Sequence, residues 1–267
     1  MRWIRSGWYY LRSIFRILLN FKNLPVLLPL FLNPTHSGEH QIILRQPPLR
    51  LQVRGAMDVW SVKETFLDSF YTRYGVSIQN GWQVLDIGAG IGDFSLYAAY
   101  GNPQTVVYAF EPFPDSYNLM IKNLTVNAIN NVRAFQQALW SQNGRLALDL
   151  SAGEPLKITS KGPDLAGIYR DAITVQAYSL GQVLKNHEND LINLMKMDCE
   201  GAEYAILLGA SCEVMSRIER IIMEYHDLDA DHNHEILVFF LEKMGFRVST
   251  HKNMVYDHIG YLFATRS

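Results

Sequence analysis

The sequence has few cysteines, no marked excess of one charge and no long uninterrupted apolar run. Two cysteines in 267 residues, Cys199 and Cys212, exclude a disulfide framework and indicate a reducing compartment. The formal net charge of −2 provides no global field that would attract nucleic acid. Arg12, Arg16 and Lys22 interrupt the apolar stretch near the N-terminus, so this stretch does not predict a membrane-spanning helix.

The chain does contain enough apolar residues for a large core, because 48% of its residues are hydrophobic. From residue 81 onward, strand and helix patterns alternate, which predicts a mostly parallel α/β sheet with helices on both faces. The expected strands lie at 83–87, 105–110, 132–136, 191–198, 218–224, 246–250 and 259–264. The expected helices lie at 91–101, 114–127, 179–187, 202–216 and 234–244.

We expect three segments along the chain: an N-terminal helix and proline-rich linker (1–35), a hairpin and helix (36–80), and a cofactor-binding domain (81–267). Prolines indicate that 24–46 is a linker, and the apolar spacing predicts a helix over 59–74. The glycine- and proline-containing region 143–173 is expected to be an irregular insertion over the ligand crevice.

The N-terminus has the pattern of a helix with a basic polar side and an aromatic-aliphatic side. The polar side would carry Arg2, Arg5, Tyr9, Arg12, Ser13, Arg16 and Asn20, and the apolar side Ile4, Trp8, Leu11, Phe15, Leu18 and Leu19. This pattern is typical of a helix that lies in a membrane interface. The alternative is a helix docked on the catalytic domain or on a second subunit. No small-x-small cleavage site follows Leu32, so we expect a cytoplasmic protein, with residues 2–22 contacting the inner face of a membrane.

A glycine-rich turn is the most informative feature of the chain. An apolar run ends in Asp86, and glycine then occupies every second position at Gly88, Gly90 and Gly92. Glycine permits positive φ and leaves no Cβ to block a close approach, and the following helix would direct unpaired N–H groups to the same spot. The pattern therefore predicts a turn that binds a nucleotide-type cofactor.

Two cofactors compete for this turn. A dinucleotide fold requires a third glycine three residues after Gly90, where this chain has Asp93. S-adenosylmethionine has no phosphate but carries an ammonium and a carboxylate, which suit an acid and free N–H groups. Glu111, 21 positions after Gly90, would accept the ribose hydroxyls of either cofactor. The missing third glycine favours S-adenosylmethionine.

Acidic residues gather at two further strand ends. Asp198 and Glu200 end one expected strand, and Glu224 and His226 end the next. Like charges brought together need compensation by a divalent metal, a raised pKa or a cationic substrate group. In the alternative interpretation, Glu200 and Glu203 cap a helix and pair with a nearby Lys or Arg, namely Lys196 or Arg220.

These motifs together resemble the FkbM-type methyltransferases, which are S-adenosylmethionine-dependent O-methyltransferases with a seven-stranded Rossmann-like sheet. The resemblance covers about residues 50–264 and leaves the N-terminus outside it. Cys199 departs from it, because an aliphatic residue is expected there. The motifs that carry it are 84–93 (VLDIGAGIGD), 109–112 (AFEP), 118–127, 137–139 (QAL), 196–203 (KMDCEGAE) and 224–226 (EYH).

The resemblance implies a role for each site residue. The methionine end of the cofactor would be held by Asp86, Gly88, Ala89 and Gly90, the ribose by Glu111, and the adenine would be bordered by Gln137 and Ala138. The acceptor would face Asp198, Glu200, Glu224 and His226. His226 is the preferred general base because its ordinary pKa lies near neutrality. In a second route, Asp198 and Glu224 bind a divalent ion such as Mg²⁺, which acidifies the hydroxyl.

Three functions are therefore weighed. The leading one is an O-methyltransferase acting on a hydroxyl of a small molecule, such as a sugar, a glycan or a lipid-linked acceptor. The second is an NAD(P)-dependent oxidoreductase, and the third a non-catalytic adenosyl-binding module tethered to a membrane. Methylation of DNA bases is not expected, because no Asn/Asp-Pro-Pro-aromatic block follows the fourth strand and no basic face is visible.

Overall fold

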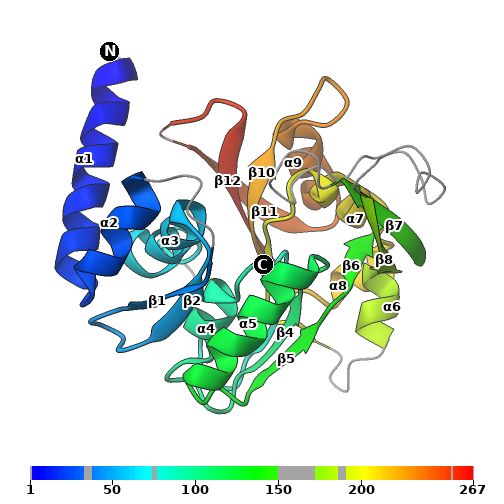
Figure 1. Ribbon diagram of the computed structural model, residues 1–267. Helices are drawn as coiled ribbons and strands as arrows, with labels where there is room; N and C mark the ends of the chain where they lie inside the picture. The colour runs from blue at the N-terminus through cyan, green and yellow to red at the C-terminus, as the bar shows by residue number, and fades with distance from the viewer. Residues whose placement is uncertain are drawn as a thin grey trace.

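The computed structural model of the protein describes residues 2–32, 38–73, 77–149, 172–185, 191–253 and 255–266. Its largest element is a seven-stranded sheet with the order β11-β12-β10-β9-β3-β4-β5 (Figure 1). Among the strands of this sheet, β12 alone runs antiparallel to the others, so the predicted mostly parallel α/β sheet is confirmed. The strands are β3 (Gln83–Ile87), β4 (Val106–Phe110), β5 (Val132–Phe135), β9 (Leu194–Met197), β10 (Arg220–His226), β11 (Phe246–Lys252) and β12 (Ile259–Arg266).

The strand order reverses at β3, and this reversal positions the site. The chain proceeds from β3 to β4 and β5 on one side, and β9 and β10 are then added on the other side of β3. In open parallel sheets, ligands bind outside the carboxyl ends of the strands at such a switch point. The crevice is therefore expected above the ends of β3, β4, β9 and β10.

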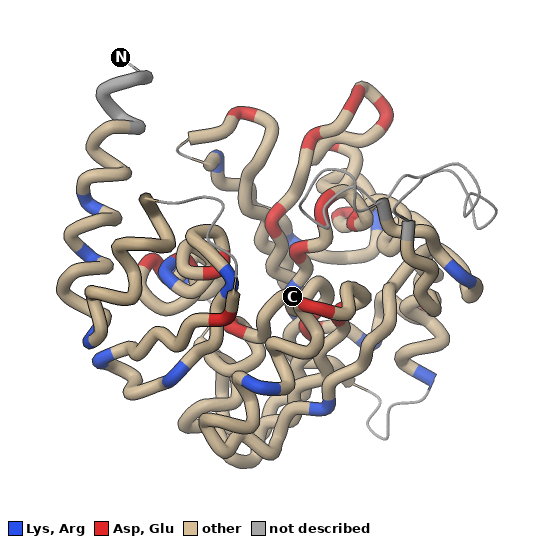
Figure 2. Tube along the Cα trace, viewed as in Figure 1, with Lys and Arg blue, Asp and Glu red and all other residues tan. Residues whose placement is uncertain are grey.

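The N-terminal third of the described chain forms a layer beside the sheet (Figure 1). It comprises α1 (Arg2–Asn20), α2 (Leu24–Leu32), the antiparallel pair β1 (His40–Ile43) and β2 (Arg50–Val53), α3 (Ala56–Lys63) and the π-helical turn η1 (Glu64–Asp68). Its apolar residues and those of the sheet domain share one buried cluster, which joins Ile17, Phe21 and Leu30 to Ala109 and Leu119. Along the traced chain in Figure 2, α1 carries basic positions and no acidic ones. Over the part of the chain that the structure describes, every helix is too short or too polar to cross a bilayer.

Two expectations for this layer were wrong. The predicted linker is largely ordered structure, because α2 buries Leu27 and Leu30 despite Pro29 inside the helix. Packing against the core outweighs the poor helix propensity of proline. The helix expected over 59–74 starts earlier and ends sooner, since it widens into η1 and stops at Ser69, whose φ is +55°.

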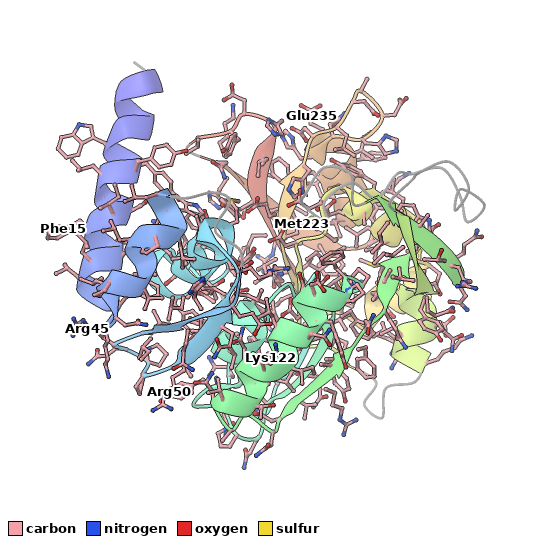
Figure 3. All side chains as sticks on the ribbon, viewed as in Figure 1. Phe15, Arg45, Arg50, Lys122, Met223 and Glu235 are labelled. Atoms are coloured by element: carbon pink, nitrogen blue, oxygen red, sulfur yellow. The ribbon has the colours of Figure 1, made fainter. Side chains whose placement is uncertain are left out.

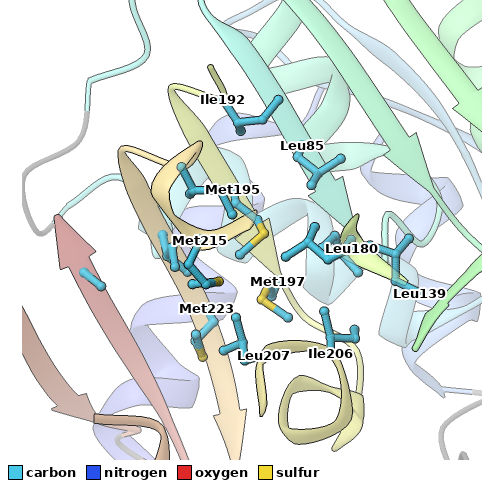
Figure 4. Packing of buried hydrophobic residues seen from close by; sticks show 14 of the residues in the cluster. Leu85, Leu139, Leu180, Ile192, Met195, Met197, Ile206, Leu207, Met215 and Met223 are labelled. Carbon is cyan, nitrogen blue, oxygen red and sulfur yellow. The ribbon is translucent and has the colours of Figure 1, made fainter. Parts of the chain in front are cut away.

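Among the described residues, the two faces of the sheet are covered by the helices α4 (Asp93–Ala99), α5 (Pro114–Val126), α6 (Leu180–Lys185), α7 (Ala202–Leu208), α8 (Cys212–Ser216) and α9 (His234–Lys243). Successive residues of a strand point to opposite faces. Leu85, Met195 and Met223 accordingly pack among residues of α7 and α8 (Figure 4), whereas Val84 packs on the other face with Phe94 of α4.

The helix predicted over 202–216 is two helices. Gly209 lies so close to the turn after β6 (Ala138–Trp140) that a Cβ there would stand 2.9 Å from the Cα of Ser141. The chain bends at this contact, and Ser211 starts α8 by accepting a hydrogen bond from the Val214 N–H at 3.3 Å.

The region expected to be an irregular insertion begins and ends in regular strands. β7 (Gly144–Asp149) pairs antiparallel with β8 (Ala172–Ser179), and β8 pairs parallel with β6, which forms a three-stranded sheet. Residues 150–171 lie outside the described residues, so the expected cover over the crevice stays a prediction.

Candidate active site

A cavity of about 830 Å³ lies at the carboxyl ends of the central strands. Small-molecule sites in proteins occupy roughly 300–1,000 Å³, so this cavity has the size of a cofactor site with additional space beside it. Its walls combine both groups of residues that the sequence nominated, the glycine turn with Glu111 and the acidic residues Asp198 and Glu224.

The glycine turn forms one wall of the cavity. Gly88, Gly90 and Gly92 all have positive φ, at +71°, +55° and +82°. A Cβ on Gly88 would collide with the backbone carbonyl of Asp198, and one on Gly92 would approach Met120 to 2.7 Å. Apart from its chain neighbours, no atom of the described residues lies within 4 Å of the Cβ position of Gly90, which lines the cavity. The outer two glycines therefore permit close packing, and the central one leaves the turn open toward a ligand.

Asp86 lies beneath this turn and is not among the residues that line the cavity. One of its oxygens accepts a hydrogen bond from Ser95 Oγ at 2.6 Å, and the other lies 3.2 Å from Lys196 Nζ. Lys196 also donates to the Gly88 carbonyl at 2.8 Å. Burial lowers the pKa of Lys196, but the charges of Asp86, Asp198 and Asp93 outweigh burial and raise it. Asp86 and Lys196 thus form a buried ion pair that holds the turn from below.

Glu111 links the turn to the end of β4. Its two carboxylate oxygens accept hydrogen bonds from the backbone N–H groups of Gly90 and Phe113, both at 2.8 Å. Burial raises the pKa of Glu111 to about 7, although these two hydrogen bonds oppose the shift. The carboxylate lines the cavity, where its remaining lone pairs suit a pair of vicinal hydroxyls.

The opposite end of this wall is aromatic and apolar. Gln137 and Ala138, which the family resemblance assigned to the adenine border, line the cavity just after β5. Phe110 and Phe135 stack behind them with ring centroids 4.8 Å apart. Apolar and aromatic side chains at this end of the cavity suit a planar base, so these positions fit the predicted adenine border.

The second wall gathers the acidic residues. Asp198, Glu200 and Glu224 line the cavity, and His226 is buried directly behind them. The His226 Nε2 lies 3.2 Å from Glu200 Oε2 and 3.8 Å from Glu224 Oε1. Its Nδ1 lies 3.0 Å from Glu203 Oε1, in a carboxylate that is fully buried. The structure thus brings all four sequence-predicted acceptor residues together.

The charges in this cluster shift the affinity of its members for protons. Burial lowers the pKa of His226, but the hydrogen bond to Glu203 and the charges of Glu203, Glu200 and Asp198 outweigh it and raise the pKa to about 10. Burial, together with the charges of Asp198 and Glu64, raises the pKa of Glu224 well above its ordinary value. The cluster concentrates negative charge around a single imidazole and therefore attracts a cation or a hydrogen-bond donor.

The same residues are arranged as a metal site could be. One ligand atom each from Asp198, Glu224 and His226 lies within 4.8 Å of the others. Glu203 bonds the far nitrogen of His226, as carboxylates commonly do behind a histidine ligand. The donor set of two carboxylates and one imidazole fits a divalent cation.

The alternative in which Glu200 and Glu203 only cap a helix and pair with Lys196 or Arg220 is wrong. Gly201, with φ of +97°, occupies the N-cap of α7, which has no side-chain cap. Lys196 pairs with Asp86, and Arg220 pairs with Glu219 at 2.6 Å. The two carboxylates are directed at His226 instead.

Sequence reasoning missed several residues of the site that come from the N-terminal layer. Tyr71 donates a hydrogen bond to Asp198 Oδ2 at 2.8 Å, and Glu64 lines the cavity with its pKa raised to about 7 by burial. Ser61 and Thr65 of this layer donate hydrogen bonds to Asp93 at the start of α4. Their only sequence signal was the polar character of an otherwise apolar segment, because nothing local shows that this segment folds against the cofactor turn.

A seven-stranded, mostly parallel sheet with a glycine turn, a ribose-type acid and an acidic second wall at its switch point defines the class of the protein. It is an α/β methyltransferase with the Rossmann-like topology. The family model for the methyltransferase FkbM domain matches residues 86–248, which is more than half of the chain. The chain belongs to the FkbM methyltransferase family, and it is an S-adenosylmethionine-dependent methyltransferase of that type.

Three curated relatives show how far the similarity extends. Methyltransferase sdnD of Sordaria araneosa is 29% identical over 61% of this chain and 72% of its own length. The 31-O-demethyl-FK506 methyltransferase FkbM of Streptomyces tacrolimicus is 27% identical over 62% and 74%. The hexuronic acid methyltransferase AglP of Haloferax volcanii is 23% identical over 66% and 70%. Membership of this family decides against the NAD(P)-dependent oxidoreductase.

Proposed function

We propose that the protein transfers the methyl group of S-adenosylmethionine to a hydroxyl oxygen of a small molecule. The observation that carries this proposal is one continuous cavity whose two walls have different chemistry. Gly90, Glu111 and Ala138 belong to the cofactor wall, and Asp198 and Glu224 to the acceptor wall. A methyl donor held on the first wall would face an acceptor held on the second.

Within the cofactor wall we assign the residues as the family resemblance implies, and their place in the cavity supports this assignment. Gly88, Ala89 and Gly90 present the turn to the methionine end, Glu111 accepts the ribose hydroxyls, and Gln137 and Ala138 border the adenine. Asp86 acts through the turn, because it is fully buried and bonded to Ser95 and Lys196.

A hydroxyl acceptor suits the second wall. Carboxylates accept hydrogen bonds from hydroxyl groups, and the acidic wall offers three of them, from Asp198, Glu200 and Glu224. One relative is named as a 31-O-demethyl-FK506 methyltransferase and another as a hexuronic acid methyltransferase, and these names support an oxygen-bearing small-molecule acceptor. We therefore infer that the acceptor is a sugar, a glycan or a lipid-linked molecule. We also infer that residues 2–22 contact a membrane peripherally, from the cytoplasmic side.

Methyl transfer from a sulfonium is an in-line displacement, so the protein mainly aligns the acceptor oxygen and removes its proton. In one route, His226 Nε2 takes the proton while Glu203 orients the ring through Nδ1 and stabilises the imidazolium, an arrangement found in other carboxylate–histidine pairs. This route needs the ring in its neutral form when the acceptor is bound. The expectation that His226 has a pKa near neutrality was wrong, because burial, which lowers its pKa, is outweighed by the surrounding carboxylates, which raise it to about 10.

In the other route, the acceptor wall holds a divalent cation. Asp198, Glu224 and His226 would be its ligands, because their donor atoms converge and because Glu203 already supports the imidazole from behind. Such an ion, when bound, lowers the pKa of a coordinated hydroxyl. The residues themselves would then position the acceptor and keep water out.

Calorimetric titration with S-adenosylhomocysteine, with and without magnesium, tests the proposal. One-to-one binding is expected, and failure of well-folded protein to bind would overturn the methyltransferase function. A magnesium titration in the absence of cofactor tests the second route directly. If added chelator abolishes transfer and magnesium restores it, the metal route is supported over base catalysis by His226. A non-catalytic adenosyl-binding module would instead bind the cofactor and transfer no methyl group.

A further inference from the structure

Helix α1 docks on the protein through its polar side, the reverse of the usual arrangement on a globular protein. Tyr9 accepts a hydrogen bond from Lys63 Nζ at 2.9 Å, and Arg16 pairs with Asp68 at 2.5 Å. Ser13 is buried in the same interface. Tyr9, Ser13 and Arg16 of the polar side thus face α3 and η1, whereas Arg12 stays exposed.

The apolar side of α1 consequently faces solvent. The large apolar side chains whose burial the structure describes on this side, from Trp8 to Leu19, are between 49% and 68% exposed. Phe15 points away from the body of the molecule (Figure 3). Helix α2 packs its inner residues on the same buried cluster as α1 and adds further exposed apolar residues. The apolar surface consists of Trp8, Leu11, Ile14, Phe15, Leu18 and Leu19 of α1, Leu28, Phe31 and Leu32 of α2, and Met57 of α3. Exposed apolar residues gathered in this way mark an interaction site.

The charge around the apolar surface identifies its partner. Residues 1–38 contain five basic residues and no acidic one. Arg12 and Lys22 are exposed, and so are Arg45 and Arg50 on the neighbouring β1–β2 hairpin. A helix with aromatic and aliphatic side chains among basic residues fits the surface of an anionic bilayer. A second copy of the chain would bring two basic surfaces together, because a two-fold interface places the same patch on both sides.

The apolar surface continues into the wall of the active-site cavity. Phe31 and Met57 belong to both, since each is exposed and each lines the cavity. Leu30 and Trp60 extend the apolar lining inward toward Glu64 and Tyr71. An acceptor that arrives along this path meets apolar side chains first and the acidic wall afterwards.

We propose that the apolar surface lies in the interface of an anionic membrane, and that the acceptor is an amphiphile whose hydroxyl-bearing head enters the cavity past Phe31 and Met57. Its apolar part stays in the bilayer or against α2. The proposal has two parts: membrane binding by the apolar surface is the docking half, and the amphiphilic acceptor is the acceptor half. The docking half is argued from the apolar surface alone, whereas the acceptor half rests on the proposed methyltransferase function.

Vesicle co-sedimentation of the full chain with saturating S-adenosylhomocysteine tests the docking half. The protein is expected to pellet with equimolar phosphatidylcholine and phosphatidylglycerol vesicles and more weakly with phosphatidylcholine alone. The double variant Leu11→Glu/Phe15→Glu should lower partitioning by about tenfold or more, since two large apolar side chains no longer enter the interface. The matched control is Phe239→Glu on α9, because Phe239 is 61% exposed and Phe15 is 62% exposed.

Several outcomes would overturn the docking half. Wild-type protein that stays in the supernatant, or a double variant that pellets like wild type, would do so. A dimer in light scattering that the double variant converts to monomer would assign the surface to a second copy. Unchanged binding of S-adenosylhomocysteine by both variants shows that they are folded.

Radiolabelled S-adenosylmethionine tests the acceptor half. Incubation with a total polar lipid extract should place label in the organic phase, and the Asp198→Asn variant should not. Absence of label from the lipid fraction overturns the amphiphilic acceptor. If folded wild-type protein does not bind S-adenosylhomocysteine, the proposed methyltransferase function is overturned. The result of the vesicle experiment does not depend on that outcome.

Discussion

We expect cofactor affinity to depend on pH through Glu111, because this carboxyl group is buried and yet lines the cofactor wall. Its pKa is raised to about 7, and the groups that bond it are the N–H groups of Gly90 and Phe113. Ribose hydroxyls donate to a carboxylate, so the ionised form is the one that binds cofactor. Between pH 8 and pH 6 the ionised fraction falls by about tenfold, and the affinity for S-adenosylhomocysteine should fall by the same factor.

The stability of the empty protein should change in the opposite direction. A carboxyl group whose pKa is raised on folding favours the folded state while it is protonated, so its contribution is fully present below the unfolded pKa of 4.5 and is lost as the pH rises through about 7. One pKa unit corresponds to about 1.4 kcal/mol, so the loss is on the order of 3 kcal/mol at pH 8. Protein without cofactor should therefore be more stable at pH 6 than at pH 8 as far as Glu111 is concerned.

The assay is calorimetric titration with S-adenosylhomocysteine at pH 6, 7 and 8, with Glu111→Gln as the control. Glutamine cannot ionise, and its amide N–H₂ cannot accept the second backbone N–H, so the variant should bind about tenfold or more weakly at pH 8. It should also lack the step through pH 7. An affinity of wild type that is constant from pH 6 to 8, or a step that persists in Glu111→Gln, would refute the role of this carboxylate.

Three further substitutions test the site. Gly88→Ala should lower the melting temperature and weaken S-adenosylhomocysteine binding, because the added Cβ meets the Asp198 carbonyl. The control is Gly101→Ala, where φ is +79° and the Cβ position is open. It should lower the melting temperature less. Lys196→Met should destabilise the protein by about 3–5 kcal/mol in urea unfolding, since it leaves Asp86 buried and unpaired, and Asp86→Asn in the same chain should recover part of the loss. Asp198→Asn should retain cofactor binding and lose methyl transfer. Transfer at the wild-type rate would show that Asp198 has no role in binding or activating the acceptor.

Much of the fold and of the site could be predicted from local pattern. The strand ending in Asp86 and the glycines after it occur together because a close backbone approach requires them, and the collision that a Cβ on Gly88 would cause shows why. Parallel strands present their carboxyl ends on one edge, so Glu111, Asp198 and Glu224 could be assigned to one crevice before the sheet order was known.

Other features depended on contacts that no local pattern contains. The break in the helix predicted over 202–216 follows from the approach of Ser141 to Gly209, which are far apart in sequence. The partner of Lys196 is Asp86, more than a hundred residues away, rather than the acids beside it in the chain. Tyr71 and Glu64 joined the site only because the N-terminal layer packs over the cofactor turn.

Helix α1 shows the difference between what a local sequence pattern predicts and what depends on tertiary contacts. The order of residues is enough to predict that the helix has a polar and an apolar side, because side-chain positions repeat every 3.6 residues. Which side faces the protein was decided only by tertiary structure, where Lys63 and Asp68 offer partners to Tyr9 and Arg16. The helical period specifies which residues lie on the same side of the helix. The free energy of burying one side depends on the residues that the rest of the fold packs against it.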